Sequence, residues 1–522
     1  MDEFWQGSSR AVWMQAAIAL AVWGGCLTSA DPSALFRYGL LPGIGLLFGL
    51  GAFRFTLAVS GRSISLLGKT GFGVLLVVVL VALAFLSGAF VRGTVERVAQ
   101  QMLEDPPQEA VVRIISHPQP AAFSSGGFEA EGVVQSTSGR HNPQPAGRIL
   151  VNLKCDDCEI RFGDLVSGPV TVSPVSRPGR PRLLFSFARV ESTQNPAWWA
   201  RGPSFLRSAL SDALPRGKSG TSSAEAIILG MTIGDRGGFS PLAERHLQAA
   251  NLSHLTAVSG THIMCVTIFF GTLLVAFSGR DIVQARRRRT MATLCLVVFY
   301  AFAVGPAPSV IRATVMASLT FLGISLGRGR NVVTLMALTV ICVLLLHPEL
   351  ATSLGFQLSV SATIGISLYA RGLQQLLSEL AVGRVPIPWL KAICEWATAN
   401  LAVALVAATA VFPLLSSAVG KLNVWGPIAN LLVAPAVAPI VTGGLVLAAL
   451  QLFFPVAVPA LVIVLRVMGD YVLTVAEIIS SLPGANLPWP EGRTGLILAG
   501  SLVAIVALQR PHIALFLGRF AA

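Results

Sequence analysis

The stretch that decides the fold is Ser222–Ala276, SSAEAIILGMTIGDRGGFSPLAERHLQAANLSHLTAVSGTHIMCVTIFFGTLLVA. Within it, a charged and amphipathic segment leads through Asn251–His254 into an apolar run. Two histidines, His254 and His262, flank the small-residue patch Val258–Thr261 at the start of that run. Polar groups at the start of a membrane segment are costly, so these side chains need a physical explanation.

The composition of the whole chain is that of a membrane protein. Of its 522 residues, 53% are hydrophobic and only 12% are charged, with a mean hydropathy of +0.70. A soluble domain carries about 25% charged residues, and the apolar runs approach the ~20 residues that cross a bilayer. The sequence therefore predicts a polytopic α-helical membrane protein. Its net charge of +13 is weak support for a nucleic-acid partner, because Lys and Arg accumulate in the cytoplasmic loops of membrane proteins.

Three apolar runs open the chain, at residues 11–30, 36–53 and 72–91. The first lacks a strongly basic start, which favours a spanning helix over a cleavable signal peptide. We therefore expect residues 1–91 to form an N-terminal domain of transmembrane helices.

A second membrane domain is predicted over residues 224–510, followed by a short tail at 511–522. Gly and Pro interrupt it at Gly305–Pro308 and Pro435–Pro439, where broken helices are tolerated if they are buried in protein or line a cavity. The expected total is about ten to twelve spans. After the apolar run at 258–277, the candidate spans are Met291–Val304, Ser309–Leu326, Asn331–Leu346, Leu354–Ala370, Glu395–Ser416, Pro427–Gln451, Val456–Ser481 and Thr494–Leu508.

Residues 92–223 lack long apolar runs and predict a small all-β domain. Short alternating segments are separated by Pro, Gly and Ser, which is typical of strands and turns. About five strands suit a small OB-like barrel better than a sandwich. The predicted strands are Glu109–Ile115, Gly127–Ser136, Arg148–Leu153, Leu165–Val172 and Arg182–Val190.

The distribution of basic residues predicts that this β domain is extracytoplasmic. The loop Arg54–Lys69 contains basic residues and no acid, and the cluster Arg286–Arg289 follows the apolar run at 258–277. Both loops are cytoplasmic by the excess of positive charge, and both place residues 92–223 on the opposite side of the membrane.

The histidines of the opening stretch allow several interpretations. His246, His254 and His262 recur every eight residues, but on a helix this spacing leaves them about 80° out of line. No carboxylate or cysteine completes a metal site, so none is predicted. Ser259 with His262 as its base is a conceivable nucleophile, although the GxSxG elbow is absent. Small residues for close helix packing explain Ser259 and Gly260, whereas a polar lining at a pore entrance explains the histidines as well.

Charged and polar groups also occur inside predicted spans. Asp470 has Arg466 four residues before it and Glu477 seven residues after it. Ions at bilayer depth cost about 2.5–3.5 kcal/mol on insertion scales, so they face protein or water. Arg466 and Asp470 either neutralise each other or line a hydrophilic path together with Glu477. Arg312 and Gln357 are polar groups in similarly apolar surroundings.

One segment of the β domain combines basic and aromatic side chains. Basic groups with aromatic faces on a small barrel suit single-stranded nucleic acid, although a solvated edge strand explains the pattern equally well. The candidate DNA contacts are Arg177, Arg180, Arg182, Phe185 and Phe187.

Cys155 and Cys158 form a lone CxxC pair in the same domain. Structural zinc requires a second pair of ligands, so a local disulfide or two free thiols is expected in an oxidising exterior. The chain also lacks the G-x-x-x-x-G-K-[ST] loop of nucleotide-binding proteins, and no cofactor is predicted.

The segment Leu252–His262, LSHLTAVSGTH, resembles the long LSHLLAVSGLHV signature of the ComEC family of bacterial competence proteins, with Thr261 in place of the usual Leu. The resemblance implies an inner-membrane channel for imported transforming DNA, with an OB-like domain before it. It extends over about Ser222–Pro490. Further matching segments are Gly234–Arg236, Pro308–Ala313, His347–Pro348, Gly355–Ser359 and Gly426–Leu431.

The chain departs from many family members at one important point. They end in a metallo-β-lactamase-like domain that requires an HxHxDH cluster, and no histidine here forms one. The resemblance therefore implies a channel without its own nuclease, and not an enzyme. The seven histidines are His117, His141, His246, His254, His262, His347 and His512.

Together, these features predict a multi-pass protein of the bacterial inner membrane that takes up single-stranded DNA in natural competence. Expected partners are single-stranded DNA, membrane lipid, a cytoplasmic DNA motor or DNA-binding proteins and an extracytoplasmic DNA receptor, with homo-oligomerisation left open. The alternatives are a secondary transporter of a small solute or peptide and a membrane-embedded hydrolase. The predicted DNA path consists of Asp235, His254, Ser259, Gly260, His262, Arg312, Gln357 and Asn430.

Overall fold

The computed structural model describes Trp23 and residues 100–508, apart from gaps at 115–118, 121–126, 138–148, 155–163, 175–182, 188–189, 191, 195–197, 215–223, 236–237, 277–281, 306, 326–331 and 382–384. Apart from Trp23, the predicted N-terminal transmembrane helices lie outside the described residues. The chain divides into two compact units, Met1–Ser204 with Ser278–Phe356 and Phe205–Phe277 with Gln357–Ala522.

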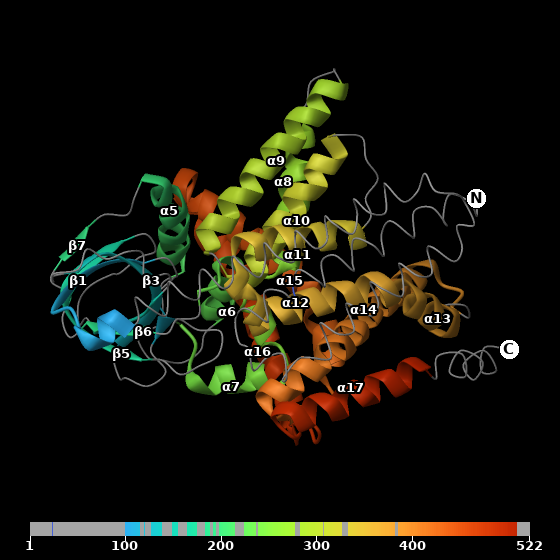
Figure 1. Ribbon diagram of the computed structural model, residues 1–522. Coiled ribbons are helices and arrows are strands. Elements are labelled where there is room, and N and C mark those ends of the chain that lie inside the picture. Colours follow the sequence, from blue (N-terminus) through green and yellow to red (C-terminus); the bar gives the residue numbers. More distant parts are fainter. Residues whose placement is uncertain are drawn as a thin grey trace, which may run out of the picture. The chain divides into compact units, whose positions relative to one another are not determined.

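Strands of the first unit close into a small barrel. β1 runs antiparallel to both β3 and β5, β3 pairs with β4, and β5 pairs with β6, whereas β4 and β6 are parallel. Because β1 bonds to two strands of the path, the sheet closes on itself (Figure 1). All five predicted strands occur, with ends that differ by a few residues. The strands are β1 Glu109–Ile114, β2 Gln119–Pro120, β3 Gly127–Thr137, β4 Ile149–Lys154, β5 Leu165–Pro174, β6 Leu183–Phe187 and β7 Ser192–Gln194.

The barrel interior is filled by alternating side chains from these strands, as expected from the two-residue period of a strand. Val112, Val151, Phe185 and Phe187 are fully or almost fully buried. Gly132 leaves room for them, since a Cβ there would lie 2.5 Å from Val112 Cγ1 and 2.8 Å from Val151 Cγ2. The barrel is therefore a packed core.

The described part of the first unit also contains three helices, and the first of them includes the arginine cluster that the charge pattern predicts in a loop. They are α9 Ile282–Val304, α10 Pro308–Ser325 and α11 Val332–Leu346, and α10 packs against the other two. The chain breaks between α9 and α10 as predicted. Gly305 has φ +104° there, a backbone conformation that glycine adopts without a steric penalty.

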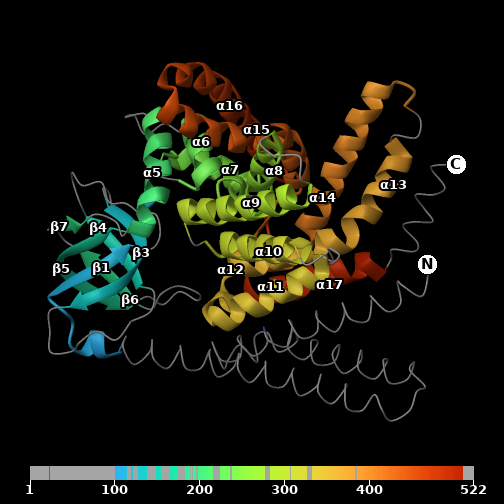
Figure 2. The ribbon, with the colours of Figure 1, turned by 90° about the horizontal axis from the view of Figure 1, so that it is seen from above.

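The second unit is mainly helical in its described part, with one short two-stranded sheet, β8 Lys421–Leu422 and β9 Leu487–Pro488. Helix α5 enters it from the β domain, and α13 and α14 form neighbouring arms of a hairpin (Figure 2). Its main elements are α5 Trp198–Ala213, α6 Ala224–Ile233, α7 Pro241–Ala249, η1 Ser253–Leu255, α8 Gly260–Ala276, α12 Leu354–Gly365, η3 Ile366–Ala370, α13 Arg371–Ala381, α14 Pro388–Val419, α15 Gly426–Phe453, η4 Pro455–Ala457, α16 Val458–Ser481 and α17 Gly492–Leu508.

Helix α6 is the buried centre of this unit. It packs against α15 and α16, and every residue except Glu225 is buried. Two glycines allow the close approach: a Cβ on Gly444 would overlap Thr232, and a Cβ on Gly469 would lie 2.8 Å from the Ala224 carbonyl oxygen. Ten residues span about 15 Å, roughly half of a hydrocarbon core, so α6 is too short to cross a bilayer.

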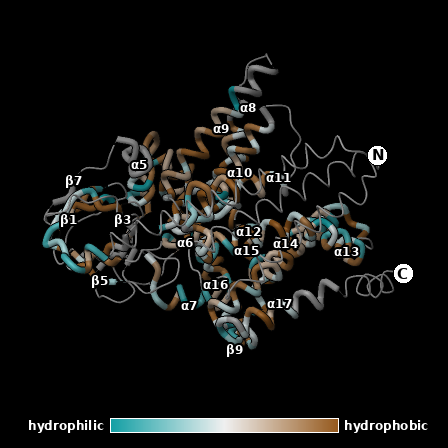
Figure 3. Tube along the Cα trace, viewed as in Figure 1, coloured by the Kyte–Doolittle hydropathy of each residue, from teal (hydrophilic) through white to brown (hydrophobic). Residues whose placement is uncertain are grey.

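Among the described residues, three helical segments are long and apolar enough to cross a membrane: Pro388–Val419, Gly426–Phe453 and Pro455–Ser481. Figure 3 shows hydrophobic residues along α14 and hydrophilic ones on α13. The described part of the chain thus supports a membrane protein, with fewer full-length spans than the sequence predicts. Shorter apolar helices are Ala224–Ile233, Gly260–Leu273, Pro308–Gly323 and Thr334–Leu346.

The predicted break at Pro435–Pro439 is wrong, because both prolines lie inside the continuous helix α15. Proline removes a backbone donor, but neighbouring helices can support the freed carbonyls. Pro435 frees the carbonyl of Leu431, and the Tyr471 hydroxyl of α16 donates a hydrogen bond to the neighbouring Leu432 carbonyl at 2.7 Å.

Replacing Ser240 with alanine should destabilise α7 by about 1 kcal/mol. Ser240 is the N-cap of α7, and its Oγ accepts a hydrogen bond from the Ala243 backbone N–H at 3.2 Å. Thermal unfolding of the detergent-solubilised protein, followed by tryptophan fluorescence, would measure the loss. Ser240→Asp keeps a capping acceptor and should unfold like the wild type; an equal loss in both variants would contradict the capping role.

Candidate functional site

The segment between α7 and α8 turns sharply at Asn251. This residue has φ +59°, a left-handed conformation that asparagine tolerates better than most residues. The Leu252 N–H then bonds back to the Leu247 carbonyl at 2.7 Å, which closes the end of α7. After this turn, the chain continues through η1, which carries His254, to the start of α8.

His262 caps the N-terminus of α8. The Ser259 backbone N–H donates to His262 Nδ1 at 3.0 Å, and Ser259 Oγ lies 3.0 Å from the same nitrogen. This is the arrangement of a capping box, with histidine at the position three residues after the N-cap that Glu or Gln usually occupies. Because Nδ1 accepts a backbone hydrogen bond, the neutral ring carries its proton on Nε2.

The Nε2 atom of His262 is buried and has no hydrogen-bond partner among the described residues. The residue as a whole is only 1% exposed. The backbone of Leu255 makes a weak contact with the ring, but no acceptor in the described part of the chain meets the distance and angle of a full hydrogen bond to Nε2.

His254 connects η1 to the first turn of α15. Its Nδ1 lies 3.0 Å from the Asn251 carbonyl, and because a carbonyl can only accept, Nδ1 is the donor. The side chain of Asn430 lies close enough to affect the ring of His254, and its Nδ2 donates to the Gly426 carbonyl at 3.0 Å. The surrounding chain desolvates the imidazole and lowers its pKa, although part of the side chain is exposed.

These contacts define a polar cluster, Asn251, His254, Ser259, His262 and Asn430. Helices α8 and α15 pack together, and both begin in the cluster, so their positive N-terminal ends lie there. No member of the cluster is acidic. Four of the predicted path residues are thus brought together, with Gly260 as the first residue of α8. Asn251 was not predicted; its only sequence signal is an asparagine at the end of a helix.

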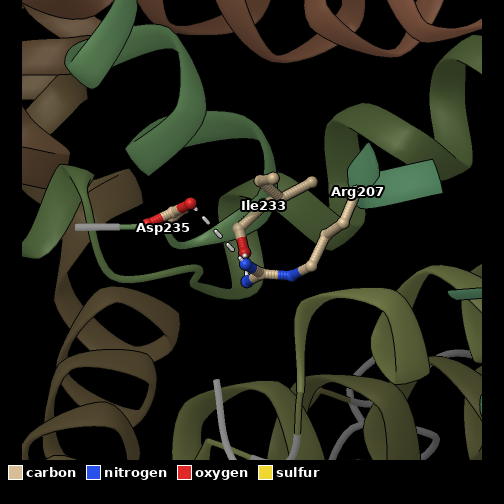
Figure 4. Close-up of polar contacts among 3 residues, drawn as sticks. All are labelled: Arg207, Ile233 and Asp235. Carbon is tan, nitrogen blue, oxygen red and sulfur yellow. Dashed lines mark hydrogen bonds and ion pairs between the residues drawn. The ribbon is translucent and has the colours of Figure 1, made fainter. Parts of the chain in front are cut away.

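Asp235, a predicted path residue, forms an ion pair between two helices. Its carboxylate is 8% exposed, and Oδ2 lies 3.9 Å from Arg207 Nη1 of α5. Arg207 Nη2 also donates to the Ile233 carbonyl at 2.7 Å, so one guanidinium connects α5 to the C-terminal end of α6 (Figure 4). Gly234, with φ +72°, provides the turn between the two acceptors. Asp235 is therefore an anchor between helices.

Arg312 and Gln357 remain predicted path residues. Arg312 lies in the first unit, on α10, and is 5% exposed. Its Nη1 lies 3.9 Å from the sulfur atoms of Met316 and Met336. Gln357 is half-buried on α12 in the second unit.

The charges of α16 do not form the self-neutralising pair that was one of the two alternatives. Arg466 bonds to Glu225 of α6, with Nε 2.6 Å from Oε1, instead of to Asp470. Asp470 and Glu477 are exposed. Sequence reasoning missed Glu225 because its partner lies far along the chain.

Of the predicted DNA contacts on the β domain, Phe185 and Phe187 are 0% and 1% exposed. Their rings fill the barrel core and offer no face to a base. Arg177, Arg180 and Arg182 lie outside the described residues.

The structure describes only part of the residues that could form metal or disulfide sites. Within the described part of the chain, no group of three or more His, Cys, Asp or Glu side chains is placed to hold a metal ion. His246 instead contacts Ser480, with Nδ1 2.6 Å from Oγ. Cys155 and Cys158 lie outside the described residues.

Comparison with known proteins identifies the family. The family described as Competence protein matches residues 231–512, more than half of the chain. The ComE operon protein 3 of Bacillus subtilis (strain 168) is 28% identical over 155 residues, which are 30% of this chain and 19% of that protein. The chain thus matches about a fifth of the length of this relative. No solved structure matches the chain. The polar cluster lies inside the matched region, and the chain belongs to the competence protein family, the ComEC family of the sequence resemblance.

Proposed function

We propose that the protein is the membrane channel through which single-stranded DNA enters the cell during natural competence. Membership of the competence family supports a role in DNA uptake. The observation that carries the channel proposal is the polar cluster of neutral side chains, which gathers at two helix N-termini within a largely apolar bundle.

Neutral polar groups suit the passage of a polyanion. A dense set of Lys and Arg side chains would bind the phosphate backbone tightly and oppose release. Conduction requires binding that is strong enough to admit the strand and weak enough to let it leave. Histidine and asparagine side chains with helix N-termini supply hydrogen bonds and partial positive charge of this moderate kind.

We place the protein in the bacterial inner membrane as a multi-pass protein. The closed five-strand ring supports an OB-like domain, which on our proposal lies outside and meets the incoming strand. Because Phe185 and Phe187 are buried, this contact is assigned to Arg177, Arg180 and Arg182. The proposed partners are single-stranded DNA, membrane lipid, a cytoplasmic DNA motor or DNA-binding proteins, an extracytoplasmic receptor and further copies of the chain.

A membrane-embedded hydrolase is the second candidate, because Ser259 Oγ lies 3.0 Å from His262 Nδ1. However, the same nitrogen accepts the Ser259 backbone N–H, and Nε2 has no carboxylate to orient it. Ser259→Ala separates the two functions: it would abolish turnover by a hydrolase but should leave most DNA uptake. The solute transporter, with Asp470 and Glu477 as a proton relay, predicts proton-coupled flux that is independent of DNA.

The experiment that tests the channel is transformation of a deletion strain with linear DNA fragments. The strain should lose transformation, and the wild-type gene should restore it, whereas His254→Ala and Arg312→Ala should restore it poorly. Arg245→Ala is the matched control, because this arginine is exposed on α7 outside the cluster. Normal transformation by the deletion strain would overturn the proposal.

A further inference from the structure

We propose that the polar cluster is a phosphate-binding site, in which the buried Nε2–H of His262 donates a hydrogen bond to one phosphodiester of the passing strand; this rests on the proposed function. The site would take a phosphodiester oxygen from any nucleotide, because it contacts the backbone of the strand.

The burial of His262 Nε2 without a full hydrogen bond is the observation that points to a ligand. The capping box occupies only Nδ1, so the second ring nitrogen carries a proton that the cap does not use. The residue is 1% exposed, and the atom has no partner among the described residues. A buried donor without an acceptor is costly, and a ligand oxygen would satisfy it.

The surroundings of His262 favour an anion as that ligand. Helix α8 begins at Gly260 and α15 at Gly426, and a helix N-terminus presents unbonded N–H groups and partial positive charge to an anion. His254 and Asn430 add neutral polar groups, and no member of the cluster is an acid that would repel phosphate.

Capping alone does not require a histidine at position 262. Glu and Gln are the usual residues there, and each accepts the same backbone N–H. Glu supplies only acceptors when ionised, whereas Gln supplies an acceptor and a second donor. Comparing His262→Glu with His262→Gln therefore tests the role of the Nε2–H donor while the acceptor of the helix cap is kept.

The test measures binding of a fluorescent single-stranded oligodeoxynucleotide to the full-length protein in detergent. His262→Gln should bind close to the wild-type affinity. His262→Glu, which places an acceptor without the donor in a buried position, should unfold at a lower temperature than the wild type, and its folded fraction should lose about tenfold or more in affinity. His262→Asp, with a shorter acceptor, provides a second variant without the donor if His262→Glu does not fold.

A methylphosphonate oligonucleotide lacks backbone charge but keeps one phosphoryl oxygen on each phosphorus. It should bind the wild type more weakly than the charged strand does, because a neutral acceptor takes a weaker hydrogen bond from Nε2–H. The proposed phosphate site is contradicted if His262→Glu or His262→Asp binds the charged oligonucleotide as tightly as the wild type. It is also contradicted if folded His262→Gln binds this oligonucleotide as weakly as the Glu and Asp variants. That result leaves the channel proposal standing, since wild-type binding and transformation are measured separately. Failure of the wild type to bind, with normal transformation of the deletion strain, would overturn both.

Discussion

Replacing Gly469 with alanine should sharply reduce the amount of folded protein. A Cβ at this position of α16 would lie 2.8 Å from both the Cβ and the carbonyl oxygen of Ala224, and 3.0 Å from its Cα. Two of these three atoms belong to the backbone of α6, so no rotation of a side chain can relieve the overlap. Helix α6 is buried between α15 and α16, so one of the helices must shift.

The expected cost is about 2 to 3 kcal/mol, the upper part of the range for overpacked cores, and it outweighs the gain of about 1 kcal/mol in helix propensity from Gly to Ala. Thermal unfolding of the detergent-solubilised protein and its yield after size-exclusion chromatography would measure the effect.

Gly443→Ala is the matched control for Gly469→Ala. Its Cβ would approach Leu465 most closely at the side-chain atom Cδ2, 2.7 Å away, and a leucine can rotate to make room. Both substitutions gain the same helix propensity, so the difference between them isolates the backbone contact. Equal melting temperatures for the two variants would show that α6 and α16 are not packed as described.

The sequence predicts best what depends on local pattern. Strand ends in the barrel and the ends of α10, α11, α15 and α16 follow from alternation, from apolar run length and from Gly and Pro. Helix α13 was not predicted, and α14 begins at Pro388, before the predicted start at Glu395. The burial of Phe185 and Phe187 was also accessible, because residues 183, 185 and 187 share one face of β6. Their aromatic character was instead interpreted as a base-stacking surface.

Contacts between distant elements could not be predicted. Glu225 and Arg466 are separated by more than two hundred residues, and nothing local favours this pair over Arg466 with Asp470. The role of Asp235 likewise depends on where α5 lies. The polar cluster could be predicted in part. His254 and His262 are close in sequence, whereas Asn430 was predicted only through the family resemblance.

Replacing Arg207 with methionine should destabilise the second unit by about 3 kcal/mol. The substitution keeps an apolar side chain of similar length but removes the cation beside the buried Asp235 carboxylate. It also removes the donor to the Ile233 carbonyl at the C-terminal end of α6, where a cation stabilises the helix dipole. We expect a lower melting temperature in detergent and a loss of transformation that follows the loss of folded protein.

A double-mutant cycle decides whether the ion pair causes this loss. Asp235→Asn alone should cost less than Arg207→Met, because it removes the buried charge instead of leaving it without its cation. The double variant should then be more stable than the sum of the two single losses predicts. Additive losses would contradict the coupling.

Arg245→Ala, which removes an exposed charge on α7, is the control and should change the free energy of unfolding by no more than about 0.5 kcal/mol. If Arg207→Met behaves like Arg245→Ala, then α5 is not anchored to α6 by this guanidinium, and Asp235 returns to the predicted DNA path.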